Sequence, residues 1–97
     1  MSGIVRPTRP KRFFYAQNVN ISYSFDRLQQ MAEKMLGASL EEGDIMICDN
    51  GNLTKRKVLQ MTKKGFMIYY ARLHGKQVFV PLAKENGVLK DPGRELL

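Results

Sequence analysis

The side chains best suited to chemistry in this sequence are cationic, and most lie in two stretches that contain no acid. These stretches contain Arg6, Arg9, Lys11 and Arg12, then Lys55, Arg56, Lys57, Lys63 and Lys64. Their charges, +4 and +5, exceed the formal net charge of +7, so the rest of the chain sums to −2. Because guanidinium and ammonium groups bind phosphates, this distribution predicts a polyanionic partner.

Two other interpretations of the basic stretches stay open. Lysines also keep small domains soluble and protect the edges of sheets. An anionic membrane surface is a further candidate for the partner, but neither stretch lies on a predicted amphipathic helix. We therefore expect no membrane partner.

Groups that could carry out catalysis are few. The single histidine, His74, precedes Gly75 in a predicted turn and has no Cys or His at metal-ligand spacing. Cys48 stands in a predicted strand, where a buried thiol is more typical than a nucleophile. Asp44 and Asp49 are five residues apart on that strand, so they face opposite sides. We expect no catalytic residue, no metal and no cofactor; a small RNA-directed toxin is the alternative.

The length and composition indicate the class of protein. Ninety-seven residues fit one domain. No apolar run approaches the roughly 18 residues that span a bilayer, and the first ten residues lack the apolar stretch of a secretory signal. A single cysteine cannot form an internal disulfide and suits a reducing cytoplasm, which is the expected compartment.

Periodicity predicts the elements that position these side chains. Residues 1–12 contain two prolines and are typical of a basic flexible arm. An aromatic run at 13–16 has strand character. Residues 25–36 repeat apolar side chains at helical spacing, with Ser24 as the N-cap and Gly37 at the C′ position.

From residue 44 the period changes to two, which is typical of strands. Strands are predicted at 45–48, after the basic triplet at 58–61, at 66–73 and at 77–80. Asn50-Gly51 predicts a tight hairpin turn. The expected fold class is α+β: an antiparallel four- to five-stranded meander sheet with one main helix packed on it. We expect a single domain at 13–82 and a C-terminal tail at 83–97 that is poorly ordered or serves a partner.

The segment 13–82 resembles a known family. The similarity begins at the strand Phe14-Tyr15-Ala16 and continues at Phe25-Asp26, Leu28, Leu36-Gly37 and Gly43. Its most specific stretch contains Lys57-Val58-Leu59, Gly65-Phe66, Tyr69-Tyr70, Arg72-Leu73, Phe79 and Pro81. In residue types, order and spacing, this stretch resembles, without a gap, a small accessory protein of bacterial insertion sequences of family 66. That protein is encoded by the second open reading frame of the element and is often labelled TnpB.

The resemblance implies a non-catalytic accessory role in DNA transposition, beside a separate transposase that carries the nuclease site. This chain departs from the family just before the helix. Where relatives carry Asp-Met-Arg-Lys-Gly, residues 20–24 are Asn-Ile-Ser-Tyr-Ser, so one basic pair of the family is missing. Tryptophans common in the later strands of the family are also absent.

Charge and resemblance together predict contacts with DNA, chiefly with its phosphates, and with the transposase. The expected nucleic-acid-binding residues are Arg9, Lys11, Arg12, Lys55, Arg56, Lys57, Lys63, Lys64 and Arg72. Alternation along a strand puts Lys55 and Lys57 on one face and Arg56 on the other, so one surface cannot use all three equally. The aromatic side chains that would stack on bases if exposed are Tyr69, Tyr70 and Phe79, but we expect each to pack in the core, because the sheet needs apolar residues. A protein-binding adaptor without direct DNA contact is the alternative, and nothing in the sequence indicates the oligomeric state.

Overall fold

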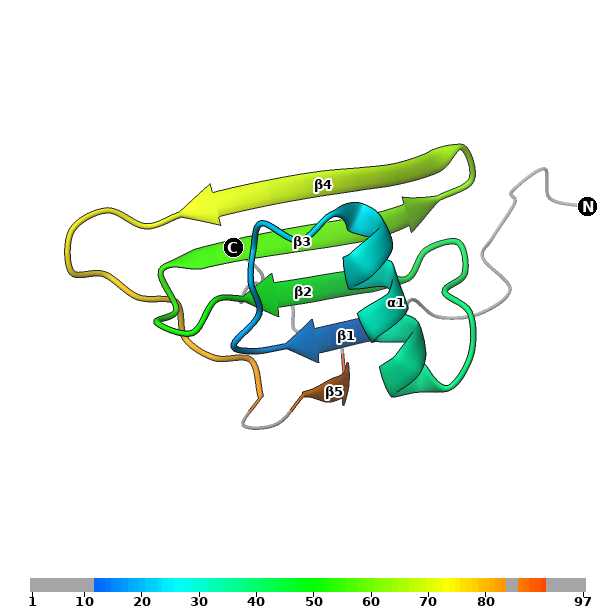
Figure 1. Ribbon diagram of the computed structural model, residues 1–97, viewed down its shortest axis with the longest axis horizontal. Helices are drawn as coiled ribbons and strands as arrows, with labels where there is room; N and C mark the ends of the chain where they lie inside the picture. Colours follow the sequence, from blue (N-terminus) through cyan, green and yellow to red (C-terminus); the bar gives the residue numbers. More distant parts are fainter. Residues whose placement is uncertain (1–11, 84–85, 91–97) are drawn as a thin grey trace, which may run out of the picture.

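A computed structural model describes residues 12–83 and 86–90 of the chain. Its elements are β1 (Phe13–Ala16), α1 (Phe25–Leu36), β2 (Ile45–Asp49), β3 (Lys55–Thr62), β4 (Gly65–Arg72) and β5 (Gly87–Leu89). The strands form one sheet in the order β4-β3-β2-β1-β5, and α1 lies across one face of it (Figure 1). The predicted α+β class, with one helix packed on a sheet, is confirmed.

The sheet differs from the predicted meander in one pairing. β1 and β2 run parallel, from Phe13 beside Ile45 to Ala16 beside Cys48, whereas the other neighbours are antiparallel. Two parallel strands need a crossover connection, because the chain must return to the same end of the sheet before the second strand begins. The connection that contains α1 makes this return, so the helix determines the topology as well as covering the core.

Helix α1 begins and ends where the sequence predicts. The Ser24 hydroxyl accepts a hydrogen bond from the Arg27 N–H at 3.3 Å, as an N-cap does. Gly37 takes the left-handed conformation with φ of 74°, and its N–H donates to the Glu33 carbonyl. These end signals are local in sequence, which explains why they predict the bounds of the helix well.

Both faces of the sheet are covered around β1 and β2. On the α1 face the buried side chains are Phe14, Ala16, Val19, Ile21, Leu28, Ala32, Met46, Cys48 and Leu59. On the opposite face they are Phe13, Tyr15, Ile45, Ile47 and Val58, packed against Leu82, Ala83 and Leu89. Neighbouring strand residues alternate between the two sets, and each apolar side chain fully buried in them stabilises the fold by roughly 1.5–3 kcal/mol.

The prediction of a strand at 77–80 is wrong, because this segment crosses a face of the sheet without forming a strand. The Phe79 N–H donates to the Leu53 carbonyl at 2.7 Å, and the Phe79 ring centroid lies 4.5 Å from the Arg56 guanidinium carbon. The Val80 carbonyl accepts from Nη2 of Arg56 at 3.1 Å. The segment therefore supplies an acceptor and a ring to a buried cation, and it leaves β4 at the edge of the sheet.

The sheet also continues beyond residue 82, where the domain was expected to end. β5 pairs antiparallel with β1, from Phe13 beside Leu89 to Tyr15 beside Gly87. A strand of three residues is too short to show a period of two, so the sequence pattern cannot reveal it.

The turn between β2 and β3 is longer than the predicted two-residue hairpin. The Asn50 side-chain oxygen accepts from the N–H groups of Thr54 and Lys55 at 2.9 and 3.0 Å. The residue with a positive φ in this turn is Leu53, at 59°. Gly51 is needed for space instead, since a Cβ there would lie 2.7 Å from the side-chain oxygen of Asn18.

A buried ion pair joins β2 to β3. Asp49 and Arg56 are 0% and 1% exposed. Nε and Nη2 of Arg56 donate to the two Asp49 carboxylate oxygens at 2.6 and 2.8 Å, and the Tyr15 hydroxyl donates to the same carboxylate at 2.5 Å. Burial alone would lower the pKa of Arg56, but the hydrogen bonds and charge of Asp49 raise that pKa above its ordinary value. Burial and the carboxylate likewise raise the pKa of Tyr15, so its hydroxyl stays a donor.

We predict that Asp49→Ala lowers the free energy of unfolding by about 3–5 kcal/mol, because it leaves the Arg56 guanidinium buried without its counter-ion. Urea denaturation followed by circular dichroism measures the change, and Asp49→Asn offers a milder variant of similar shape. Glu41→Ala is the control: its ion pair with Arg12 at 3.1 Å is half-exposed, so we expect a loss of only about 0–1 kcal/mol. Equal losses for the two alanine variants would contradict the structural role of the buried pair.

Candidate nucleic-acid interface

An open groove with a volume of about 570 Å³ lies on the α1 face of the sheet. Its lining comes from the β1–α1 connection, the β2–β3 turn and the β3–β4 hairpin, and consists of Val19, Asn20, Ile21, Ser22, Asn50, Lys55, Lys57 and Tyr70. Helix α1 covers only part of this face, and β3 and β4 extend beyond its N-terminal end (Figure 1). Segments far apart in the sequence thus meet at the uncovered part of the sheet.

Three cations share this uncovered face. In the register of β3 and β4, Lys55 lies opposite Arg72 and Lys57 opposite Tyr70. Residues directly opposite each other in an antiparallel pair project to the same side of the sheet. We call these four residues, Lys55, Lys57, Tyr70 and Arg72, the basic face.

The charges of the basic face are not neutralised by any residue that the structure describes. Among the described residues, the ion pairs that form involve Arg12 and Arg56, and Lys55, Lys57 and Arg72 take part in none. Like charges directly opposite each other on a sheet are destabilising. An anion bound between them would remove that cost, so the arrangement favours a polyanionic ligand.

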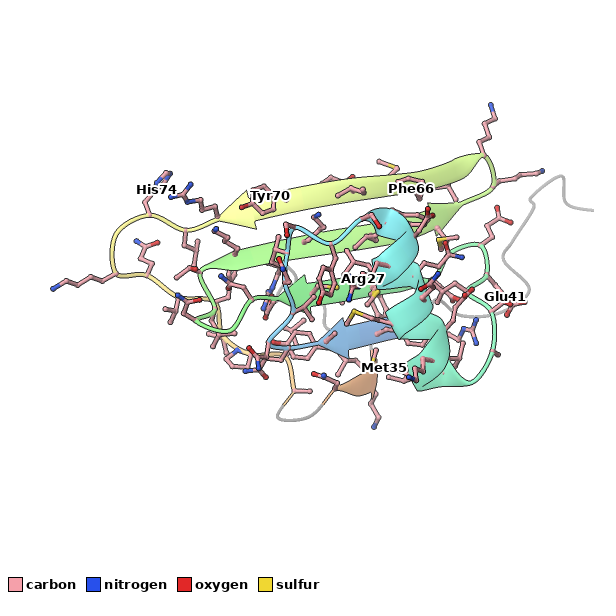
Figure 2. All side chains as sticks on the ribbon, viewed as in Figure 1. Arg27, Met35, Glu41, Phe66, Tyr70 and His74 are labelled. Atoms are coloured by element: carbon pink, nitrogen blue, oxygen red, sulfur yellow. The ribbon has the colours of Figure 1, made fainter. Side chains whose placement is uncertain are left out.

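Tyr70 adds an aromatic surface to the basic face. Its side chain projects from the end of β4 that lies away from α1, and the residue is 54% exposed (Figure 2). An exposed ring among cations is the arrangement with which single-stranded nucleic acids are bound, because the ring stacks on a base while the cations hold phosphates. Tyr69 projects to the other face of the sheet, and Phe79 lies against Arg56.

The uncharged polar residues that line the groove, Asn20, Ser22 and Asn50, were not predicted as site residues. The Asn20 side-chain oxygen accepts from the N–H and hydroxyl of Ser22 at 3.0 and 2.6 Å, which shapes the loop at this position. Beside it, the Arg27 guanidinium carbon lies 4.1 Å from the Tyr23 ring centroid. Tyr23 and Arg27 are four positions apart at the start of the helix. This spacing lets an arginine stack on an aromatic ring, so the sequence could have predicted that Arg27 lies near Tyr23.

Two of the expected phosphate-binding arginines form ion pairs within the fold. Arg56 is buried against Asp49, so it does not reach the surface. Arg12 donates to the Asp44 carboxylate at 2.9 and 2.6 Å and to Glu41 at 3.1 Å. The hydrogen bonds to Asp44 raise the pKa of Arg12, and they join the start of β1 to the start of β2.

The remaining expected residues lie apart from the basic face or outside the described residues. Lys63 and Lys64 are exposed in the two-residue turn between β3 and β4. With the length of β3 between them, they lie roughly 25 Å from Lys55. The basic stretch at 55–64 is therefore divided between the two ends of one hairpin. Arg9 and Lys11 lie outside the described residues.

The two candidates for catalysis, Cys48 and His74, lie in different settings, one buried and one exposed. Cys48 is buried in the core, and burial raises the pKa of its thiol to about 12. His74 is exposed at the loop after β4 (Figure 2). Across residues 12–83 and 86–90, no group of three or more His, Cys, Asp or Glu side chains could hold a metal ion. In the same ranges no helix is long and apolar enough to cross a membrane.

Fold and surface together define a small α+β domain whose uncovered sheet face carries clustered cations beside an exposed tyrosine. The family model described as IS66 Orf2 like protein matches residues 11–92. The chain therefore belongs to the IS66 Orf2-like family, which confirms the resemblance seen in the sequence. This family is a transposition-associated accessory protein of insertion sequences and is not a known enzyme. Searches of curated proteins and of solved structures found no match.

We predict that Cys48 in the folded protein reacts slowly with a disulfide reagent such as 5,5′-dithiobis(2-nitrobenzoate) at pH 8. The raised pKa keeps the thiol protonated at that pH, and burial blocks the reagent. Release of the coloured thiolate measures the rate, and the same protein in urea is the control that reacts fast. Rapid labelling under native conditions would show that Cys48 is accessible.

Proposed function

We propose that this transposition accessory protein binds DNA directly through the basic face. Lys55, Lys57 and Arg72 contact phosphates, and Tyr70 stacks on a base. The observation that supports this most is the placement of Lys55 opposite Arg72 with Lys57 beside them, none of them ion-paired among the described residues. The expected compartment is the cytoplasm, where a lone cysteine stays reduced.

The chemistry of the basic face favours binding that follows the DNA backbone. Successive side chains on one face of a strand lie about 7 Å apart, so Lys55 and Lys57 present two ammonium groups along a line. Lysine contacts to phosphates carry no base information, so affinity should depend weakly on sequence. Tyr70 should add a preference for unpaired bases, because a base within a duplex is already stacked.

Relatives carry an Arg-Lys pair that this chain lacks, and the position of that pair also supports the basic face as the DNA-binding surface. The Arg-Lys pair of relatives corresponds to Ser22 and Tyr23 here. Ser22 lines the groove beside Lys55 and Lys57. A family arginine at this position would extend the basic face across the groove, so this chain carries a less basic version of it.

We predict that DNA affinity falls with salt. If Lys55, Lys57 and Arg72 each neutralise one phosphate, affinity should fall roughly 40-fold between 50 and 200 mM salt. Lys55→Gln with Lys57→Gln should reduce the slope of log affinity against log salt by about 2. Fluorescence anisotropy with a labelled oligonucleotide of the element ends, single-stranded and duplex, measures both effects.

The matched control for that double variant is Lys34→Gln with Lys90→Gln, which removes the same charge from α1 and from the residue after β5. We expect its salt slope to equal that of the unchanged protein. A flat salt response, or equal losses in the two double variants, would contradict the proposal. Recovery of the transposase from nuclease-treated lysate, together with such a flat response, would favour the protein-binding adaptor.

We predict that Ser22→Arg strengthens DNA binding about eightfold at 100 mM salt, the effect of one added phosphate contact. Ser22 lies in the groove lining, so an arginine there adds its charge to the basic face. The control is Ser39→Arg, which adds the same charge at an exposed position just after the C-terminal end of α1. Anisotropy titrations of both variants measure the gain, and equal gains would show that only net charge matters.

A further inference from the structure

Strand β4 has the composition of a strand buried on both faces. Its residues 66–71 are Phe-Met-Ile-Tyr-Tyr-Ala, a near-continuous apolar run of the kind found inside sheets that are covered on both sides. Yet each residue from Phe66 to Tyr70 is between 44% and 54% exposed. Among them, Phe66 has an aromatic partner, since its ring stacks on Phe25 at a centroid distance of 3.6 Å. The apolar surface of β4 is thus larger than the folded chain uses.

Within residues 12–83 and 86–90, no strand pairs with the outer side of β4. The sheet order places β4 last, with β3 as its neighbour. The Leu73 N–H donates to the Thr54 carbonyl at 2.9 Å, which sets the alternation of the antiparallel ladder. Counting back by twos, Met67, Tyr69 and Ala71 exchange hydrogen bonds with β3. The N–H and C=O groups of Phe66, Ile68 and Tyr70 therefore point away from the sheet, toward the open edge.

This edge lacks the features with which monomeric proteins block strand addition. Such features are short length, bulges, prolines and charges within the strand. β4 has eight residues in unbroken register with β3, from Lys55 beside Arg72 to Thr62 beside Gly65. Between Gly65 and Ala71 it contains no proline and no charged residue. An edge of this kind is a template for another strand.

The charges around the edge indicate what kind of strand it accepts. Lys63 and Lys64 precede β4, Arg72 ends it, and the sequence from Asn50 to Lys84 contains no acid. In a second copy paired antiparallel about Ile68, Lys64 would lie opposite Arg72 at both ends, and like charges opposite each other are destabilising. The charge pattern therefore favours a strand with acidic ends over a second copy.

We propose that the open edge of β4 binds an extended segment of another protein as a sixth strand. That segment alternates apolar residues in its middle and carries acidic residues at its ends, where they meet Lys63, Lys64 and Arg72. This inference goes beyond DNA binding and does not depend on it. Backbone groups of β4 pair with the segment, Lys55 and Lys57 belong to the DNA surface alone, and Arg72 is the charged residue that both proposals use.

The test uses a capped peptide of sequence Asp-Glu-Val-Thr-Ile-Thr-Val-Glu-Asp and amide hydrogen exchange measured by NMR. With saturating peptide, the N–H groups of Phe66, Ile68 and Tyr70 should exchange at least about tenfold more slowly. Those of Met67, Tyr69 and Ala71 should not change, because they are already bonded to β3. A peptide with Lys in place of its four acids should bind at least about tenfold more weakly.

A pair of variants at one position separates backbone pairing from simple apolar contact. Ile68→Pro removes an N–H that faces the open edge, which edge strands tolerate, and should abolish peptide binding. Ile68→Thr keeps the N–H and should retain binding within about threefold. The Lys55→Gln, Lys57→Gln variant should bind the peptide normally while losing DNA affinity, so the two proposals fail separately.

Four results would overturn the proposal. Protection of the same amides without peptide, in a dimer that forms with rising protein concentration, would assign the edge to a second copy. Protection of these amides by a thymidine oligonucleotide, but not by the peptide, would assign β4 to nucleic acid. Chemical-shift changes without the alternating protection, or equal binding to Ile68→Pro, would exclude strand addition.

Discussion

The buried pair between Asp49 and Arg56 is the constraint on which the arrangement of the sheet depends. Two charges removed from water persist only when their hydrogen bonds are satisfied, and here the partners come from four parts of the chain. Tyr15 donates from β1, Asp49 and Arg56 join β2 to β3, and the segment after β4 contributes the Val80 carbonyl. With Arg56 facing inward, the period of two turns Lys55 and Lys57 to the other face. A contact that stabilises the fold thus also sets where the exposed charges lie.

The elements that sequence patterns predicted well are those with local signals. Helix α1 has a full apolar stripe and both caps, so its bounds follow from residues 24–37 alone. The segment 77–80 has the β-branched and aromatic residues typical of a strand, but its Phe79 ring and Val80 carbonyl contact the buried guanidinium of Arg56 instead. The three residues of β5 carry no period, and they form a strand because β1 offers an edge. The parallel pairing of β1 and β2 likewise depends on the path of the connection between them.

For the candidate site, too, sequence patterns predicted some features and missed others. Alternation correctly separated Arg56 from Lys55 and Lys57. It could not show that Arg56 is buried, because the reason is a carboxylate on another strand, nor that Arg12 is engaged by Asp44, which lies 32 positions away. A count of charges treats all cations alike. In the fold, Arg12 and Arg56 are paired with acids, whereas Lys55 lies opposite another cation, Arg72. The groove is formed by three separate segments, so only the tertiary structure shows that Ser22 lies next to the basic face.

The position of β1 between β2 and β5 has a consequence for synthesis of the protein. β1 is made before the other described strands, yet one of its edges pairs with β2 and the other with β5, whose Leu89 lies beside Phe13. An apolar strand with an unpaired edge is prone to bind other chains while it waits. Because β5 begins only at Gly87, one edge of β1 stays unpaired until that distant segment has been made, and closing so long a loop is slow.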